Sequence, residues 1–408
     1  LRGRKGVRRY LTNIKGERIS SYLQGALDTI SIAGKNLSTT LDSDLQEYGE
    51  FLMQGKRGAV VAIEPSSGQV LALINAPTYN PNLLSGGETG KNYKILEAME
   101  GNVLYQRAIK SRQPPGSIVK TMQSAIALDV GVANKYTAYR CNKNLVGCHN
   151  HESPITLPQS IQHSCNPYYY HLVNKIFTKG RKGNMAQLRK GMDQWEKYVR
   201  SFGFGSTLGI DLYGEKEGNV PDKREYDLIY GKNRWNWRTV YSIAIGQGEF
   251  SVTPLQMANL ACIMANKGFY YRPHLVTKIG EQNIVIEDSL FQKKTLVDSL
   301  HFDIVHNGMQ SVLEEDGGTA IRSRIPGLVV CGKTGTSQNP HGDDHSVFIA
   351  FAPRKNPKIA IAVFVENAGG GGGTAAPIAS LIIEKYLKKS IERKELESEM
   401  VNKIFFEQ

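Results

Sequence analysis

The chain has 408 residues, of which 40% are hydrophobic and 22% are charged. These proportions are typical of a globular protein and exclude a disordered or fibrous one. The formal charge of +12 favours acidic partners, such as anionic lipids or a polymer rich in carboxylates. Nucleic-acid binding is not expected, because no basic stripe with interleaved aromatics occurs. No run of eighteen apolar residues occurs, so these residues predict no transmembrane helix or signal peptide.

The first third of the chain predicts a polar arm, a helix and a β-hairpin. The first 36 residues are basic and polar without sustained periodicity, so we expect an arm or the end of another module. Within residues 37–53, apolar side chains recur at three- and four-residue steps, which predicts a helix. Residues 58–74 form two apolar, β-branched runs broken by Pro-Ser-Ser-Gly, which is typical of a hairpin.

The rest of the chain predicts a helical region followed by strands. Residues 110–320 alternate helical patterns with polar loops; in residues 253–268, Thr253 caps a clear apolar helix. Three strand-like runs follow, at residues 327–336, 345–353 and 358–368. A five-glycine run, expected to be a flexible turn at the end of the sheet, and an amphipathic helix come next. This order predicts an α+β domain whose sheet is assembled from residues 55–80 and 325–390.

Residues 112–130 carry the first candidate reactive group. Two prolines and a glycine precede a helix predicted to begin at Ser117, and Lys120 lies three residues further on, hence on the same face. A serine hydroxyl needs a base to become a nucleophile, and a partly desolvated lysine amine with a lowered pKa can be that base. Alone, the Ser-x-x-Lys pattern is short enough that chance explains it equally well.

Two further motifs follow in order along the chain. The first is Ser164-x-Asn166, on a predicted loop. The second is Lys333-Thr334-Gly335-Thr336, on a predicted strand. Ser-x-x-Lys, Ser-x-Asn and Lys-Thr-Gly in this order are the signature of penicillin-recognising serine acyltransferases, and three ordered matches are far more specific than one.

The signature assigns a role to each motif. Ser117 attacks a carbonyl, and Lys120 accepts its proton. Ser164 passes protons toward the leaving amine, while Asn166 holds the substrate amide. Lys333 and the threonine hydroxyls beside it bind a terminal carboxylate. The backbone N–H groups of Ser117 and of the second threonine of the strand motif form an oxyanion hole.

Longer stretches carry a resemblance to one family. GAVVAIEPSSGQVLALINAPTYNPN, FGFGSTLGIDLYGEKEGNVPD and IAIGQGEFSVTPLQMA resemble class B penicillin-binding proteins, and GKNRWNW with IGQG is most similar to the elongation branch, penicillin-binding protein 2. The resemblance implies a transpeptidase domain over residues 37–390, with an antiparallel sheet flanked by helices and a large, mostly helical insert. It also implies the end of an N-terminal pedestal in residues 1–36 and a tail in residues 391–408. The membrane anchor and most of the pedestal are expected to lie outside this chain.

The resemblance further implies peptidoglycan D,D-transpeptidation during cell elongation, and hence a role in cell shape. A D-Ala-D-Ala stem peptide would acylate Ser117, D-alanine would leave, and an amine of a neighbouring stem would take the acyl group. β-Lactam antibiotics would acylate the same serine. We expect the protein to act at the periplasmic face of the inner membrane. Its expected partners are a RodA-type glycosyltransferase and the scaffold MreC, and catalysis is expected to need no cofactor.

Three other functions use the same motifs and stay open at this point. A D,D-carboxypeptidase differs in taking water as acceptor. A serine β-lactamase needs a carboxylate or carbamate base for deacylation; Glu249 is the glutamate nearest to a motif, although a surface or core-edge role is the simpler interpretation of it. A β-lactam-sensing module would bind without turnover.

A cluster of thiols and imidazoles precedes the second motif, and it comprises Cys141, Cys148, His149, His151, His163 and Cys165. A disulfide between Cys141 and Cys148 is the simpler interpretation in the periplasm. The more specific interpretation is a structural zinc site with Cys141, Cys148, His151 and Cys165 as ligands. His149 is the alternative to His151, and His163 is expected in a loop or the core. Relatives in this branch carry a metal in this region with carboxylates among its ligands.

The position of Cys165 between two motif residues bears on its role. If Ser164 and Asn166 both face the cleft, the residue between them points into the body of the domain. We therefore expect Cys165 to anchor the loop from behind and not to attack substrate.

Overall fold

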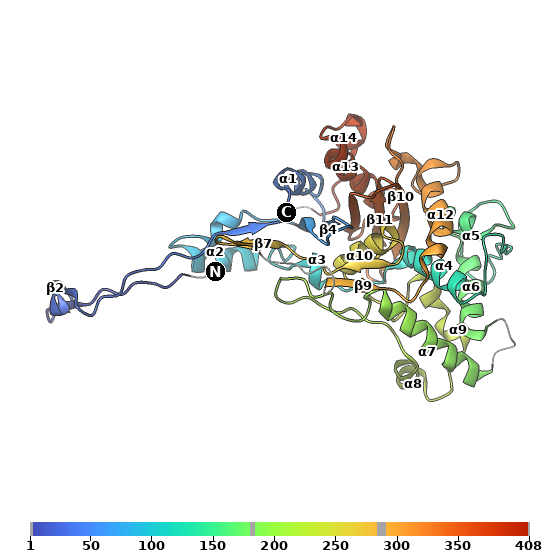
Figure 1. Cartoon of the computed structure of the whole chain (residues 1–408), viewed down its shortest axis with the longest axis horizontal. Coiled ribbons are helices and arrows are strands. Elements are labelled where there is room, and N and C mark those ends of the chain that lie inside the picture. Colours follow the sequence, from blue (N-terminus) through green and yellow to red (C-terminus); the bar gives the residue numbers. More distant parts are fainter. Residues whose placement is uncertain (1–2, 180–183, 284–290, 407–408) are drawn as a thin grey trace. The chain divides into compact units, whose positions relative to one another are not determined.

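The computed structural model describes residues 3–179, 184–283 and 291–406 (Figure 1). The outermost residues of the expected pedestal segment and tail, 1–2 and 407–408, lie outside this part. The chain divides into two units, Leu1–Thr40 with Leu275–Glu287, and Leu41–His274 with Asp288–Gln408. Among the described residues, none of the helices has both the length and the apolar character needed to cross a membrane.

The first unit consists of short, solvent-exposed strands. β1 (Tyr10–Thr12) and β2 (Arg18–Ser21) form an antiparallel ribbon, and β2 is followed by the 3₁₀ helix η1 (Tyr22–Gly25). A three-stranded sheet joins β3 (Leu37–Thr39), β7 (Val276–Ile279) and β8 (Gln282–Asn283). The exposure of the β1 and β2 side chains agrees with the polar, aperiodic sequence of this segment.

A five-stranded antiparallel sheet organises the second unit. Its strand order is β10-β11-β12-β4-β5, so that β12 from the end of the chain pairs with β4 from its beginning. The strands are β4 (Gly58–Ile63), β5 (Val70–Ala76), β10 (Cys331–Ser337), β11 (His345–Ala352) and β12 (Ile359–Val365). The α+β fold with a sheet built from both ends of the domain is confirmed, and the Lys-Thr-Gly motif lies on the edge strand β10.

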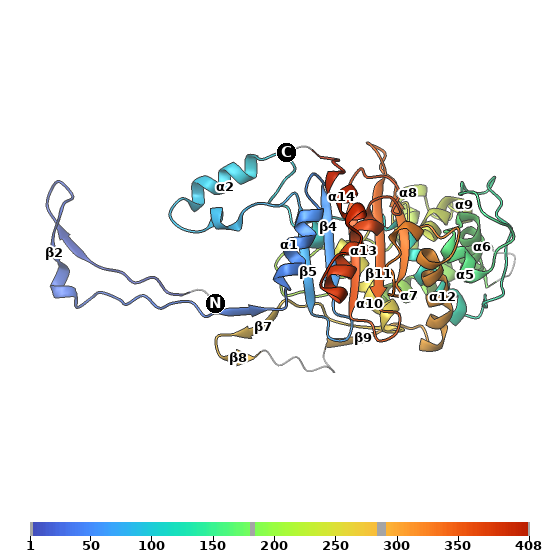
Figure 2. The same cartoon turned by 90° about the horizontal axis from the view of Figure 1, so that it is seen from above.

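Helices cover both faces of this sheet (Figures 1 and 2). On one face, α10 (Pro254–Ala265) is buried along its whole length, and the predicted cap Thr253 forms a capping box with Gln256. On the other face lie α13 (Ala375–Lys388) and α1 (Ser43–Leu52). Because α10 contacts three strands, it forms the centre of the core on its side.

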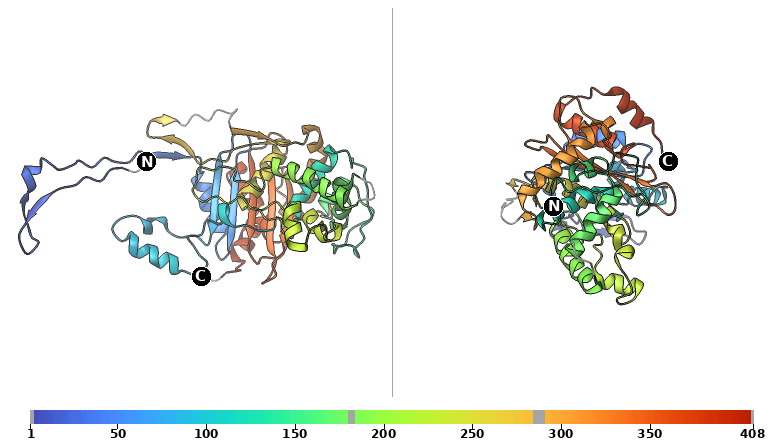
Figure 3. Two further views of the ribbon diagram at one scale, coloured as in Figure 1. Left: turned by 90° about the horizontal axis from the view of Figure 1, so that it is seen from below. Right: turned by 90° about the vertical axis from the view of Figure 1, so that its right-hand side faces the viewer.

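The mostly helical part lies beside the β10 edge (Figure 3). Its elements are η3 (Gly116–Val119), α4 (Lys120–Asp129), α5 (Leu157–Gln162), α6 (Asn166–Thr178), α7 (Met185–Ser201), α8 (Lys223–Tyr230), α9 (Trp237–Val240), η4 (Tyr241–Ile245) and α12 (Phe302–Glu314). The short helix α3 (Arg107–Lys110) lies instead against β4, β5 and α10. Smaller elements complete the unit: η2 (Pro81–Leu84), α2 (Thr89–Ala98), β6 (Phe269–Tyr271), β9 (Gln292–Lys294), η5 (Ser299–His301) and η6 (Ile321–Ser323). This arrangement places η3, which carries Ser117, against the strand that carries Lys333, and α6, which carries Asn166, against α4.

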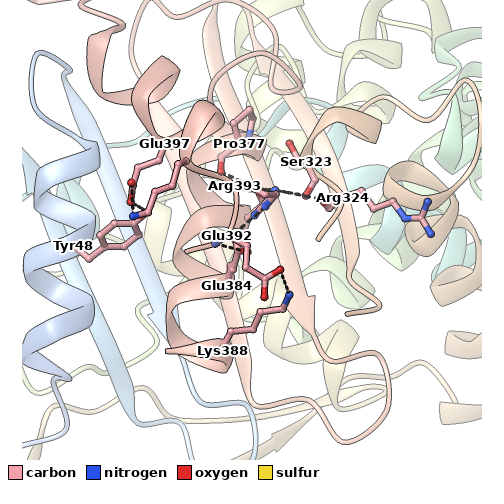
Figure 4. A network of polar contacts seen from close by, with 11 residues as sticks. Tyr48, Ser323, Arg324, Pro377, Glu384, Lys388, Glu392, Arg393 and Glu397 are labelled. Carbon is pink, nitrogen blue, oxygen red and sulfur yellow. Dashed lines mark hydrogen bonds and ion pairs between the residues drawn. The ribbon is translucent and has the colours of Figure 1, made fainter. Parts of the chain in front are cut away.

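The segment expected to be a tail contains an ordered helix, α14 (Lys394–Asn402), which contacts α1 and α13. A polar network holds it there (Figure 4). Arg393 Nε donates to the carboxylate of Glu384, which is completely buried on α13, at 2.9 Å. Arg393 Nη1 also donates to the carbonyl oxygen of Ser323 at 3.3 Å, and the hydroxyl of Tyr48 donates to Glu397 at 2.8 Å.

Breaking this buried pair is expected to destabilise the domain. Arg393→Met leaves the Glu384 carboxylate buried without its cation, which should cost roughly 3–5 kcal/mol of unfolding free energy. Urea unfolding at pH 7 measures the loss. The matched control is Arg322→Met, which breaks an exposed pair with Glu399 and should cost less than about 1 kcal/mol. Equal, small losses for both variants would contradict this account of α14.

Candidate active site

Ser117 lies in η3, which continues directly into α4. Ser117 is partly exposed, whereas the three residues after it are buried. Gly116 has a φ of +60°, and a Cβ at this position would lie 2.4 Å from the carbonyl oxygen of Thr336. Only glycine therefore lets the segment that carries Ser117 lie against the backbone of β10.

Lys120 is completely buried, one turn after Ser117. Its Nζ lies 2.7 Å from the carbonyl oxygen of Ser164, 3.3 Å from Ser164 Oγ and 2.5 Å from Asn166 Oδ1. Burial lowers the pKa of Lys120 to about 7, although the thiols of Cys148 and Cys165 act in the opposite direction. A large fraction of this amine is therefore neutral at pH 7, as a general base requires.

The Ser-x-Asn motif connects α5 to α6 and meets Lys120 from the other side. Ser164 adopts a left-handed backbone conformation, with a φ of 53°. Asn166 begins α6, and its Nδ2 donates to the carbonyl oxygen of Gly147 at 2.7 Å. Cys165 between them is completely buried, as expected for a residue that points into the domain. The structure thus brings Ser164 and Asn166 together on Lys120 and turns Cys165 away.

The Lys-Thr-Gly motif presents a buried lysine on the edge strand. Lys333 is completely buried, and its Nζ donates to the carbonyl oxygen of Thr334 at 3.0 Å. Burial, together with the positive charge of Lys120, lowers the pKa of Lys333 well below its usual value. The hydroxyl of Thr334 shares a 2.7 Å hydrogen bond with that of Thr319. Burial thus disfavours the charged form of this amine, and an incoming anion would favour it.

The glycine run forms the turn expected at the end of the sheet, between β12 and α13. A Cβ at Gly371 would lie 2.1 Å from the carbonyl oxygen of Val347 and 2.6 Å from that of Gly335. Ser346 Oγ donates to the carbonyl oxygen of Gly370 at 3.1 Å. Gly371 is therefore packed against the backbone of β10 and β11 at a place where a side chain does not fit, whereas a Cβ at Gly369 would meet nothing within 4 Å.

Four of the predicted metal ligands converge. The ligand atoms of Cys141, Cys148, His151 and Cys165 all lie within 4.8 Å of one another. His151 Nδ1 bonds the carbonyl oxygen of Glu152 at 2.6 Å, which leaves Nε2 to face Cys148 Sγ at 3.5 Å. The five cysteines all lie among the described residues and are free in the structure, which does not contain the alternative Cys141–Cys148 disulfide.

The thiols of this cluster differ in acidity. A hydrogen bond with the Cys165 thiol lowers the pKa of Cys148 to about 4, whereas Cys148 raises the pKa of Cys165. The lowered pKa of Cys148 favours its thiolate, the form in which a cysteine binds a metal. His149 lies outside the cluster. The ring of His163 stacks on His151 at a centroid distance of 5.3 Å.

Contacts that the sequence did not indicate complete the site. The ring of Tyr169 lies 5.3 Å from Lys120 Nζ, and its hydroxyl bonds Ser124 at 2.7 Å. Gln247 donates to the carbonyl oxygen of Thr336 at 2.8 Å. The tyrosine run and the Gly-Gln-Gly segment carry no pattern that points to these contacts, because their partners are distant in sequence.

This arrangement, a serine three residues before a buried lysine and beside a lysine on the edge strand of an antiparallel sheet, is typical of penicillin-recognising serine acyltransferases. The chain matches the family model described as the penicillin binding protein transpeptidase domain over residues 58–384, and it belongs to this family. Both the expected family and the expected fold are confirmed.

Individual relatives agree with this assignment. The chain is 32% identical over 382 residues to the peptidoglycan D,D-transpeptidase MrdA of Acinetobacter baumannii, covering 87% of this chain and 54% of that protein. It is 32% identical to Pseudomonas aeruginosa PBP2 in complex with WCK 5153, with a TM-score of 0.73 and coverage of 88% and 77%. A ceftriaxone acyl-enzyme complex of penicillin-binding protein A from Mycobacterium tuberculosis is 28% identical, with a TM-score of 0.70 and coverage of 87% and 80%. The chain spans about half the length of the curated relative.

Proposed function

We propose that this chain is the catalytic part of a peptidoglycan D,D-transpeptidase of the elongation branch and that it forms an acyl-enzyme on Ser117. One observation carries the proposal. The amine of Lys120, with its pKa lowered to about 7, is held by Ser164 and Asn166 one turn after the serine. Membership of the transpeptidase family and the acyl-enzyme described for the mycobacterial relative support it.

The contacts of Lys120 explain how the serine is activated. The neutral amine has two N–H groups, which donate to the carbonyl oxygen of Ser164 and to Asn166 Oδ1, and this leaves its lone pair for a hydroxyl proton. Ser117 Oγ attacks the carbonyl of the penultimate D-alanine as its proton moves to Lys120. The backbone N–H groups of Ser117 and Thr336 stabilise the oxyanion. Ser164 passes the proton to the leaving amine as the peptide C–N bond breaks, and the ester to Ser117 remains.

The strand motif accounts for recognition of the substrate. The terminal carboxylate of a D-Ala-D-Ala peptide, or the carboxylate of a β-lactam, binds Lys333 and the hydroxyls of Thr334 and Thr336. Such an anion offsets the cost of burying the charged Lys333 amine. Without a bound anion, the pKa of Lys333 is lowered. The side chain of Asn166 holds the substrate amide. An amine of a second stem peptide then attacks the ester, takes the acyl group and regenerates Ser117.

Transfer to an amine is favoured over hydrolysis. A β-lactamase needs a carboxylate that activates water, and the carboxylate of Glu249 is engaged by the hydroxyls of Tyr226 at 2.9 Å and Tyr230 at 3.5 Å.

The test supplies a stem-peptide mimic ending in D-Ala-D-Ala together with a D-amino acid as acceptor. We expect the transpeptidation product and release of D-alanine. Rapid, repeated hydrolysis of nitrocefin, or hydrolysis of the mimic alone, would favour the lactamase or carboxypeptidase.

We propose the same setting that the resemblance implies. The protein would act at the periplasmic face of the inner membrane, with a RodA-type glycosyltransferase and MreC as partners. The formal charge of +12 suits both an anionic membrane and a polymer rich in carboxylates. Co-purification of tagged, full-length protein from membranes tests the two partners.

We also propose a structural zinc ion held by Cys141, Cys148, His151 and Cys165. The donor set fits, because Cys₃His is a common set for tetrahedral structural zinc, whose ligand atoms lie about 4 Å apart. Zinc would neutralise the thiolate charge and tie residues 141–151 to the start of α6, behind Ser164 and Asn166. Catalysis itself would need no cofactor.

A further inference from the structure

Gln247, which belongs to none of the three motifs, contacts the edge strand of the site. It follows η4 in a Gly-Gln-Gly segment and is 8% exposed. Its Nε2 donates to the carbonyl oxygen of Thr336 at 2.8 Å, and its Oε1 accepts from the backbone N–H of Gln338 at 3.3 Å. The carboxamide of Gln247 therefore bonds the carbonyl before Ser337 and the N–H after it.

This pattern is the one that a neighbouring strand would make. In a parallel pair, the N–H of one residue donates to a carbonyl of the neighbouring strand, and the C=O of the same residue accepts from the N–H two residues further along that strand. The carboxamide of Gln247 supplies the same donor and acceptor to residues 336–338. Because β10 is an edge strand, its outward backbone groups can pair with an extended peptide. Gln247 closes the end of that edge, so an incoming peptide can pair only with the residues before it.

The segment of Gln247 is also bonded to the segment of Ser117. The backbone N–H of Gly116 donates to the carbonyl oxygen of Gly246 at 2.8 Å, and Gln113 exchanges two backbone hydrogen bonds with Val252. Gly246 has a φ of +73°, and a Cβ there would lie 2.2 Å from the carbonyl oxygen of Gly116. Three segments thus lie directly against one another: residues 113–117, residues 246–252 and β10.

We infer that Gln247 is a positioning residue, which fixes the backbone of Thr336 relative to Ser117. In a strand, the N–H and C=O of one residue point to the same edge. The bond that holds the Thr336 carbonyl therefore also orients the Thr336 N–H, which the proposed function places in the oxyanion hole. The inference rests on that function. Gln247 acts through Thr336 and does not itself touch the reacting atoms.

Two variants and a matched control test the inference. Gln247→Glu keeps the size but replaces the donor with a second acceptor facing the Thr336 carbonyl, and Gln247→Met removes both bonds. Gln338→Glu makes the same chemical change on an exposed side chain two residues from Thr336. Stopped-flow acylation by a fluorescent penicillin gives the first-order acylation constant and the dissociation constant of the initial complex separately.

We expect the acylation constant to fall about 10- to 100-fold in Gln247→Glu and less in Gln247→Met, because misplacing one oxyanion donor has effects of this size. The dissociation constant, the melting temperature and the Gln338→Glu variant should change little. Hydrogen exchange of the Gln338 amide should be faster in Gln247→Met. Acylation constants within twofold of the parent in both Gln247 variants would overturn the inference, as would losses that merely follow a lowered melting temperature. A parent protein that takes no label would overturn the proposed function instead.

Discussion

Replacing Lys120 with methionine is expected to lower the rate of acylation by penicillin about 100- to 10,000-fold, the range in which a positioned general base contributes. The reason lies in the site, where the buried amine is the group one turn from Ser117 that can take the hydroxyl proton. Methionine fills a similar volume, so the fold should persist. Stopped-flow labelling measures the rate, and a melting curve checks the fold. A rate within tenfold of the parent would show that another group is the base.

The pH dependence of the parent provides a second readout of the same residue. The amine of Lys120 is protonated below its pKa of about 7 and neutral above it. Because only the neutral amine accepts a proton, the acylation rate should rise as the pH increases through about 7 and then level off. In Lys120→Met this step should disappear. A rate that is flat between pH 6 and pH 8 in the parent would contradict the assigned role.

Removing the imidazole of His151 is expected to abolish zinc binding. Protein purified without added metal should contain one zinc per chain, and His151→Ala should lower the metal affinity more than about 100-fold, since it removes a ligand itself. The matched control is His149→Ala, which changes an exposed neighbour outside the cluster and should keep the metal. Elemental analysis of the three proteins measures the content.

Chelation distinguishes a structural ion from an adventitious one. A chelator should lower the melting temperature of the parent and of His149→Ala, because structural zinc contributes folding free energy directly. The melting temperature of His151→Ala should not respond. Parent protein without zinc, or a thiol titration that reveals a Cys141–Cys148 disulfide, would contradict the proposed site.

The catalytic motifs could be predicted because their chemistry imposes local spacing. When one helix carries both a nucleophile and its base, the two must lie on the same face, as Ser117 and Lys120 do with a spacing of three residues. The strands of the sheet are apolar and β-branched, and their order along the chain indicated a sheet built from both ends. The convergence of the cysteine and histidine side chains could be predicted for the same reason, since Cys148 and His151 have the local spacing of metal ligands, whereas the metal itself stays a prediction.

The features that the sequence did not reveal depend on contacts between distant residues. The carboxamide of Gln247 bonds the backbone of Thr336, 89 residues away, and Gly-Gln-Gly by itself indicates only a turn. The glycine run could be predicted as a turn, but its sequence does not show that the backbone of β10 and β11 lies against Gly371. In α14, Met400 is the one buried residue, so the apolar pattern that marks a helix was too weak.

The central claim, a serine acyl-enzyme, is tested most directly by locating the penicillin adduct. The protein is incubated with penicillin, its intact mass is measured, and the digested peptides are mapped by tandem mass spectrometry. We expect one adduct per chain, carried by Ser117, and none in Ser117→Ala. An unmodified parent, or an adduct that persists in Ser117→Ala, would contradict the account.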